Sequence, residues 1–246
     1  MPSHKSTTRQ AWAWLKRMAL GAAEVFAPVA YCAECGAALN SSEVGVCRLC
    51  LDRLPVTSFE AWPQNPVKTR MDGRILLVSA FSCYYFHKGE TLRRLIHQFK
   101  YSGNRNVATD LGREMGRRAS AAGFTDNYDA LIPVPLHWRR EWRRGYNQSL
   151  VIARGIAEVT GLQVMTDVLL RRRAAPTQTH LNAEQRHLNV RNVFSLGRGA
   201  QRAKGMRLLL VDDVFTTGAT SEACLEKLLE IEGVKLGLAT LGYASS

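Results

Sequence analysis

The spacing of hydrophobic residues predicts alternating strands and helices from residue 75 onward. Uninterrupted apolar runs indicate buried strands, and apolar residues three and four positions apart indicate helices. The predicted strands cover 75–86, 130–134, 162–170, 206–211 and 234–243, and the predicted helices cover 90–99, 106–121, 148–159 and 220–229. Because strands that are apolar on both faces alternate with helices, we predict an α/β fold built on a parallel sheet.

The residues before this region follow a different pattern. Residues 8–26 place apolar side chains at helical spacing with basic residues between them, which predicts an amphipathic helix. Its Trp12 and Trp14 would also suit a membrane surface, although packing against the protein itself is the commoner use of such a face. We predict three parts: an N-terminal helix in 1–30, a four-cysteine module with a linker in 31–72, and an α/β domain in 73–246.

Composition and charge indicate a folded chain with a concentrated basic region. The 246 residues are 46% hydrophobic, with 33 Lys and Arg against 21 Asp and Glu, which excludes a disordered or collagen-like chain. Residues 131–207 alone carry a net charge of +10, which favours a phosphate-binding site for a small ligand or a nucleic acid. A solvated basic surface is the alternative. We find neither an export signal nor an apolar stretch that could span a membrane, so we expect a cytoplasmic protein.

Four cysteines form the pattern C-x2-C-x11-C-x2-C, at Cys32, Cys35, Cys47 and Cys50. In a cytoplasmic protein, close cysteine pairs favour metal binding over disulfides. Two pairs on separate turns can supply all four corners of a tetrahedron and leave no open position, so we predict a structural Zn²⁺ ion. An iron–sulfur cluster is the alternative. The nearby Arg48 and Arg53 would also allow this module to contact a nucleic acid.

The segment LLLVDDVFTTGAT, residues 208–220, predicts a ligand site. A buried strand leads into Asp212 and Asp213 and then into a loop of small residues that begins a helix, and ligands bind beyond such strand ends. Backbone N–H groups and hydroxyls of the loop would hold a phosphate; its residues are Thr216, Thr217, Gly218, Ala219 and Thr220. The two carboxylates would repel a phosphate but suit ribose hydroxyls or hydrated Mg²⁺. Capping the helix would need only one of these residues, so the segment predicts a ribose 5-phosphate site.

This segment resembles the phosphoribosyl pyrophosphate (PRPP) motif of type I phosphoribosyltransferases. The resemblance implies that Asp212 and Asp213 hold the ribose diol and that residues 216–220 bind the 5-phosphate. In these enzymes the pyrophosphate lies against a loop after an earlier strand, and the stretch PVPLHWRREWRRGYNQ, 133–148, is similar in position. It leaves a strand through two prolines, bends at Gly145 and is too dense in arginine for a simple amphipathic helix. A solvated basic turn is the alternative to a pyrophosphate-binding role. The candidate pyrophosphate contacts in it are Arg144 and Asn147, followed by Arg139 and Arg143.

The polar stretch 171–191 shows no clear periodicity, and loops of this length in a compact domain are usually functional lids or disordered. As a cationic lid it would exclude water and offset the charge of a departing pyrophosphate. Gln178 and Arg186 are its candidate contacts, although the same arginines could equally bind a nucleic-acid backbone.

The order of the motifs resembles the ComF family, which includes the GntX-like proteins. The series runs from the cysteine cluster through HQFKYSG, PVPLHWRREWRRGYNQ and RRRAAPTQTHLNAEQRHLNVRNVF to the PRPP motif, over about residues 26–243. The basic, tryptophan-bearing extension before the cysteines lies outside the shared pattern. The resemblance implies a PRPP-binding protein that acts in DNA uptake during natural transformation, with single-stranded DNA and a helicase-like protein as partners.

Two functions remain open on this reading. An enzyme would be a phosphoribosyltransferase of nucleoside metabolism that releases pyrophosphate with Mg²⁺ present, and it would need no protein nucleophile because its transition state is oxocarbenium-like. The alternative is a non-catalytic accessory protein that binds single-stranded nucleic acid and keeps the PRPP site as a sensor or a relic.

Overall fold

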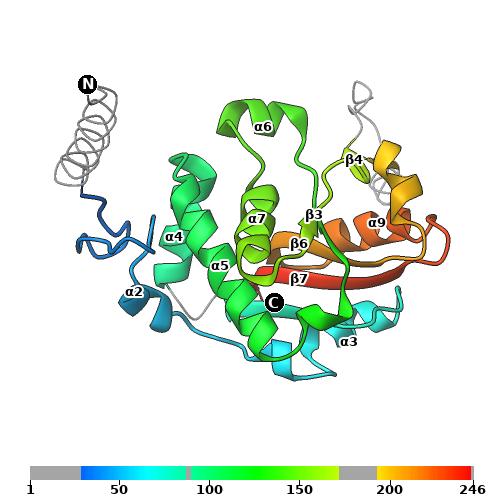
Figure 1. Ribbon diagram of the computed structural model, residues 1–246, viewed down its shortest axis with the longest axis horizontal. Coiled ribbons are helices and arrows are strands. Elements are labelled where there is room, and N and C mark those ends of the chain that lie inside the picture. The colour runs from blue at the N-terminus through cyan, green and yellow to red at the C-terminus, as the bar shows by residue number, and fades with distance from the viewer. Residues whose placement is uncertain (1–28, 87–89, 172–192, 245–246) are drawn as a thin grey trace, which may run out of the picture.

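A five-stranded parallel sheet forms the centre of the molecule (Figure 1). The computed structural model describes residues 29–86, 90–171 and 193–244. In strand order the sheet contains β1 (Ala80–Tyr85), β7 (Lys235–Tyr243), β6 (Arg207–Phe215), β2 (Ala130–Pro133) and β3 (Gln163–Val164). A separate antiparallel pair joins β4 (Leu169–Arg171) to β5 (Phe194–Leu196). The predicted α/β fold with a parallel sheet is confirmed.

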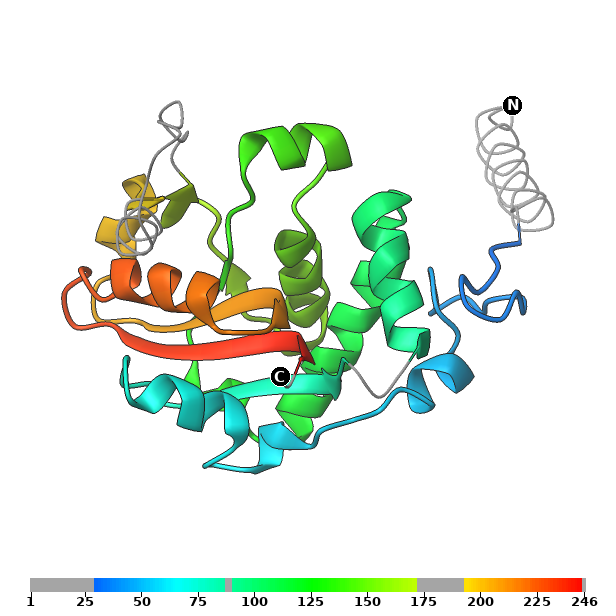
Figure 2. The ribbon, with the colours of Figure 1, turned by 180° about the vertical axis from the view of Figure 1, so that it is seen from behind.

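Helices cover both faces of the sheet because the chain crosses it in both directions. The helices are α2 (Arg48–Asp52), α3 (Pro66–Asp72), α4 (Glu90–Tyr101), α5 (Arg105–Ala121), α6 (Trp138–Arg144), α7 (Gln148–Thr160) and α9 (Ala219–Leu228). The connections from β1 to β2 and from β2 to β3 run one way across the sheet, and that from β6 to β7 runs the other way. Right-handed crossovers therefore place α5 and α7 on one face and α9 on the other (Figures 1 and 2).

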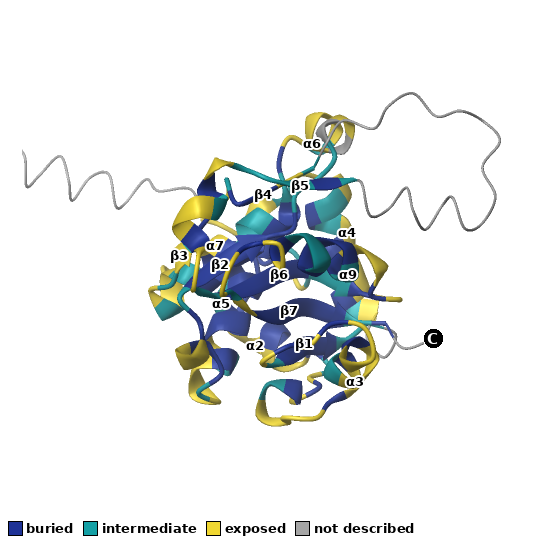
Figure 3. Cartoon of the chain, turned by 90° about the vertical axis from the view of Figure 1, so that its right-hand side faces the viewer, coloured by how far each residue is buried: buried dark blue, intermediate teal, exposed yellow. Residues whose placement is uncertain are grey.

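The middle strands are buried on both faces, as Figure 3 shows. Leu208 to Val211 in β6 and Leu236 to Leu241 in β7 are covered by the two helical layers. This explains why these strands are continuous apolar runs in the sequence. Because β6 is buried along most of its length, polar residues at its end lie where the strand emerges from the core, at the carboxyl edge of the sheet.

Two glycines bring α5 and α7 into close contact. A Cβ atom on Gly112 would lie 2.4 Å from the carbonyl oxygen of Ile152, and one on Gly155 would lie 2.5 Å from that of Thr109. Both obstacles are backbone atoms, so no side chain larger than hydrogen fits at either position. The close packing fixes α7 against α5.

Several sequence expectations were wrong in detail. The predicted strand 162–170 is two strands in different sheets. Met165, just after β3, donates its N–H to Leu131 of β2, whereas the carbonyl oxygen of Asp167 accepts the N–H of Gly199 in the 3₁₀ helix at Arg198–Ala203, and β4 follows. The stretch 133–148, expected to be too rich in arginine for a simple amphipathic helix, contains α6, which His137 caps and Gly145 ends in the left-handed conformation. Its arginines are compatible with a helix because Arg139 and Arg143 face solvent.

Some expectations fall on residues that the structure does not describe. The predicted helix in 8–26 and the lid residues Gln178 and Arg186 lie outside the described residues. The predicted linker contains a 3₁₀ helix at Phe59–Ala61 and α3, which packs against β1 through buried Val67 and Met71, and the domain limits at 30 and 72 stay predictions. Within the described ranges, no helix has both the length and the apolar character needed to cross a membrane.

Candidate functional site

The four cysteines of the predicted metal site lie together. All the Sγ atoms of Cys32, Cys35, Cys47 and Cys50 lie within 4.8 Å of one another, and none of them is in a disulfide. Gly36, with φ of 71°, closes the first turn, and Cys47 is the N-cap of α2, which carries Cys50. Four converging thiols without another type of ligand could hold a tetrahedral metal ion such as Zn²⁺.

Backbone hydrogen bonds prepare one of these thiols to ionise. Burial opposes the charge on Cys32, but backbone hydrogen bonds at Cys47, Cys35 and Glu34 outweigh it and lower the pKa of Cys32 to about 7. The Cys47 N–H group donates to the Cys32 sulfur at 3.3 Å. Burial raises the pKa of Cys50 and of Cys47. Three cysteines of the cluster are buried and Cys35 is exposed, so a bound cation would supply the charge that the buried thiolates need.

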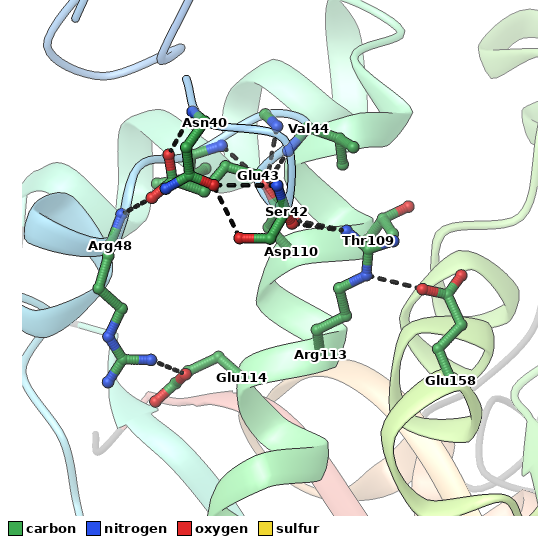
Figure 4. A network of polar contacts seen from close by, with 12 residues as sticks. Asn40, Ser42, Glu43, Val44, Arg48, Thr109, Asp110, Arg113, Glu114 and Glu158 are labelled. Carbon is green, nitrogen blue, oxygen red and sulfur yellow. Dashed lines mark hydrogen bonds and ion pairs between the residues drawn. The ribbon is translucent and has the colours of Figure 1, made fainter. Parts of the chain in front are cut away.

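The cysteine module is fastened to α5 by one buried carboxylate (Figure 4). Oδ2 of Asp110 accepts the backbone N–H groups of Val44 at 3.0 Å, Gly45 at 2.7 Å and Val46 at 2.9 Å. A Cβ atom on Gly45 would lie 2.5 Å from the backbone of α5, so only glycine allows this approach. The loop before Cys47 is therefore positioned by α5.

The same module also contacts α4. Glu34, between the first two cysteines, accepts hydrogen bonds from Arg94 and, at 3.2 Å, from Thr91. Gln98 donates to the carbonyl oxygen of Ala33 at 2.8 Å. The first cysteine turn is thus bound along the side of α4.

The acid pair predicted to hold the ribose lies at the end of β6. Oδ1 of Asp212 accepts a hydrogen bond from the Ser149 hydroxyl at 3.0 Å and from the Asp213 N–H at 2.9 Å. Burial, and then the neighbouring charge of Asp213, raise the pKa of Asp212 to about 7. Nζ of Lys100 lies 2.7 Å from Oδ2 of Asp213. The ends of β6 and α4 and the start of α7 therefore meet at this carboxyl edge.

The predicted phosphate loop follows directly. Thr216, Thr217, Ala219 and Thr220 are exposed, and Gly218 is buried with φ of 83° at the N-cap of α9. A Cβ atom on Gly218 would lie 3.0 Å from the ring of Phe215. Arg70 of α3 donates to the carbonyl oxygen of Thr216 at 2.9 Å. The loop presents hydroxyls and the positive end of a ten-residue helix to solvent, beside a cation.

The predicted pyrophosphate residues are spread over α6 and the start of α7. Arg139 and Arg143 lie on the exposed side of α6. Arg144 is half-buried, donates to Gln148 at 3.1 Å and lies over the ring of Tyr101, with its CZ atom 5.3 Å from the ring centroid. The Asn147 amide caps α7 through Ser149 and donates to Val134 at 2.9 Å. Both ends of that amide are engaged within the fold, and the pyrophosphate role of this group stays a prediction.

Three residues at this edge were not assigned from sequence. Ser149 has a local signal, since it lies two positions after the N-cap Asn147. Lys100 lies within the HQFKYSG motif, but nothing in the motif points to Asp213. Arg70 reaches the loop from 146 positions away and has no signal at all.

Comparison with known proteins finds relatives but no matching family model. The chain is 35% identical over 144 residues to the DNA utilization protein YhgH of Salmonella typhi, covering 56% of this chain and 61% of the relative. It is 34% identical over 152 residues to Competence protein F of Haemophilus influenzae, covering 61% of this chain and 66% of that protein. It is 25% identical over 203 residues to Competence protein ComFC of Bacillus subtilis, covering 81% of this chain and 78% of that protein. The chain thus spans about three-fifths of the length of the first of these relatives.

Solved structures show a weaker likeness. A glutamine PRPP amidotransferase from B. subtilis, complexed with ADP and GMP, has a TM-score of 0.40 at 21% identity, over 58% of this chain and 30% of its own. A hypothetical protein from Neisseria gonorrhoeae with bound ppGpp has a TM-score of 0.37 at 16% identity, over 56% of this chain and 67% of its own. The parallel fold described above rests on the strand order of the sheet itself.

Proposed function

Since the chain belongs to the ComF-like family, we propose that it binds PRPP at the carboxyl edge of its sheet and acts in the uptake of DNA for natural transformation. The observation that supports PRPP most is the arrangement at the end of β6. There Asp212 and Asp213 are consecutive residues of a buried strand. Ser149 contacts the Asp212 carboxylate, and Lys100 contacts that of Asp213. An exposed loop at the N-terminus of α9 follows within a few residues.

Each part of this edge suits one part of PRPP. The carboxylates accept hydrogen bonds from the two ribose hydroxyls, and residues 216–220 offer N–H and hydroxyl donors to the 5-phosphate. Lys100 offsets the charge of Asp213, and Arg70 adds positive charge beside the loop. An anionic sugar can therefore approach a pair of acids that would otherwise repel it.

Residues around the acid pair would receive the pyrophosphate. Arg144 lies over the ring of Tyr101, the last residue of α4. Arg139 and Arg143 lie on α6 together with Arg144. Exposed guanidinium groups bind phosphate oxygens in a bidentate manner. Gln178 and Arg186 complete the proposed set. Mg²⁺ bound with PRPP would neutralise part of the pyrophosphate charge, and carboxylates such as Asp213 are ligands of the type that it prefers.

A role in DNA handling in the cytoplasm has separate support. Relatives are named a DNA utilization protein and Competence protein F. The exposed side of α6 carries Trp142, with 87% of its surface accessible, between Arg139 and Arg143. An aromatic ring flanked by cations suits a single-stranded nucleic acid, whose bases stack and whose phosphates pair with arginine. A non-catalytic protein that binds single-stranded DNA, with a helicase-like partner, is therefore the second candidate.

Calorimetric titration of the zinc-loaded protein with PRPP, with and without Mg²⁺, tests the first proposal. We expect saturable binding that strengthens with Mg²⁺ and is lost in the Asp212→Asn, Asp213→Asn double variant. The matched control, Asp126→Asn with Asp129→Asn, removes two acids away from the site and should bind normally. If the acid-pair variant binds PRPP as tightly as the parent, the site assignment is wrong.

A titration with a labelled thymidine oligonucleotide at several salt concentrations tests the second proposal. Direct phosphate contacts predict an affinity that falls steeply as salt rises. We expect Trp142→Ala to weaken binding several-fold through lost stacking, about 1–3 kcal/mol per stacked base. Binding that is absent or insensitive to salt would refute direct DNA contact.

A further inference from the structure

We propose that a cavity of about 490 Å³ along α4 is the binding site of the phosphoribosyl acceptor, and that it takes a planar heteroaromatic ring with an acidic substituent. This inference rests on the proposed function, since an acceptor has a role only in a protein that binds PRPP for transfer. Nothing in the acid pair or the phosphate loop specifies an acceptor, so its chemistry has to come from surfaces beside them.

The cavity adjoins the proposed sugar site. It is lined by Phe86, just after β1, and by the side of α4 that carries Arg93, His97, Lys100 and Tyr101. Lys100 lines the cavity and also forms the ion pair with Asp213 at 2.7 Å. A ring bound in the cavity would therefore lie next to a ribose held by the acid pair, so that a ring nitrogen could bond to the anomeric carbon as the bond from that carbon to pyrophosphate breaks and pyrophosphate leaves.

The walls of the cavity suit a flat aromatic ring. Tyr101 is 60% exposed, and its ring centroid lies 4.7 Å from that of His97. On another side, Phe86 is half-buried and offers a second ring. The volume falls in the range of small-molecule sites, which combine aromatic walls with a few polar groups. A single or fused heteroaromatic ring fits this description better than an aliphatic amine.

The charges of the cavity suit an acid. Three cations line it against one carboxylate, Glu90. Arg94 is already engaged by Glu34 of the cysteine module, and Lys100 is engaged by Asp213. Among the residues that the structure describes, no carboxylate pairs with Arg93, which is exposed on the same side of the helix. A free guanidinium beside aromatic rings can bind the carboxylate or phosphate of a ring-bearing ligand in a bidentate manner.

Matched pairs of acidic and neutral ring compounds test this inference by calorimetry on the full zinc-loaded chain. The probes are orotate against uracil and nicotinate against nicotinamide, each titrated alone and with PRPP bound. We expect at least one acid to bind about tenfold more tightly than its neutral partner, the effect of one charge-assisted hydrogen-bonded pair.

Variants of Arg93 then locate the site. Arg93→Gln should lose that tenfold preference, and Arg93→Lys should keep part of it through the retained charge. Arg154→Gln is the matched control, because Arg154 is an exposed arginine on α7 that does not line the cavity. PRPP affinity should be the same in all three variants, since none of them alters the acid pair or the phosphate loop.

The outcomes separate the two proposals. If PRPP binds but acid and neutral probes bind equally, or Arg93→Gln changes nothing, the acceptor assignment is wrong and the proposed function stands. If PRPP does not bind, the proposed function fails and the acceptor role fails with it. If a thymidine oligonucleotide displaces the acid and Arg93→Gln weakens both, the cavity belongs to a nucleic-acid surface and the acceptor assignment is overturned.

Discussion

Replacing Asp110 with alanine should release the cysteine module from the rest of the protein. In the parent, one carboxylate oxygen accepts three backbone N–H groups, of Val44, Gly45 and Val46, and two of these bonds are buried. A buried N–H group that loses its acceptor costs about 1–3 kcal/mol. Arg113, the other partner of Asp110, keeps its ion pair with Glu158 at 2.7 Å and adds little. We therefore expect Asp110→Ala to lower the free energy of unfolding by about 3–5 kcal/mol.

The measurement combines urea unfolding with the rate at which a chelator removes zinc. The loop held by Asp110 runs directly into Cys47, so the variant should also release zinc faster. Asp110→Asn keeps the shape but loses the charge and should cost about 2 kcal/mol. Asp52→Ala is the control, because Asp52 belongs to the same module but is half-exposed and, within the described part of the chain, pairs with Arg48 alone; we expect this variant to cost under about 1 kcal/mol. A cost for Asp110→Ala as small as the control's, with unchanged zinc release, would refute the anchoring role.

Three further changes have expected outcomes. Ser149→Ala removes the hydroxyl that bonds to Asp212 and should weaken PRPP binding several-fold in calorimetry, about 1 kcal/mol, while helix content stays the same. Gly155→Ala would place a Cβ atom 2.5 Å from the Thr109 carbonyl and should lower the free energy of unfolding by about 2–4 kcal/mol, whereas Gly73→Ala, which meets no atom within 4 Å, should not. The hydrogen bonds from Arg207 lower the pKa of Asp129 below its usual 3.8, so this pair stabilises the fold above that pH and is lost as the pH falls below it. Acid unfolding of Asp129→Asn should accordingly show a weaker dependence on pH below about 4 than the parent does.

The sequence predicts those parts of the fold in which a local pattern carries the whole signal. Leu208 to Val211 form an unbroken apolar run because helices cover both faces of the strand, and the acids must follow where that cover ends. The C-x2-C spacing of the cysteines likewise predicts, from local sequence alone, that the thiols of each pair lie close together. By contrast, only Thr166 and Asp167 interrupt the segment 162–170 where the chain leaves one sheet for another, and so short a polar step does not reveal that the strands on its two sides pair with different partners.

The partners of the acid pair could not be predicted for a different reason. Lys100 and Asp213 meet only because α4 and β6 end at the same edge, and that depends on the order of strands in the sheet. The α6 helix was missed because most of its described side chains are exposed, which leaves no apolar periodicity to detect. A tertiary contact between distant segments decided the first case, and the lack of a buried face decided the second.

The helix α4 joins the cysteine module to the proposed sugar-phosphate site, which is far from it in sequence. Along its length it is held by Glu34 and Ala33 of the cysteine module, and at its last turn Lys100 contacts Asp213. A metal that orders the first cysteine turn thereby reduces the freedom of the helix that a ligand at Asp213 must otherwise restrict. Linkage requires the effect to be reciprocal, so a ligand that favours this position of α4 also strengthens retention of the metal. If the proposed sugar-phosphate site is correct, its affinity should therefore rise when the cysteine module holds a metal.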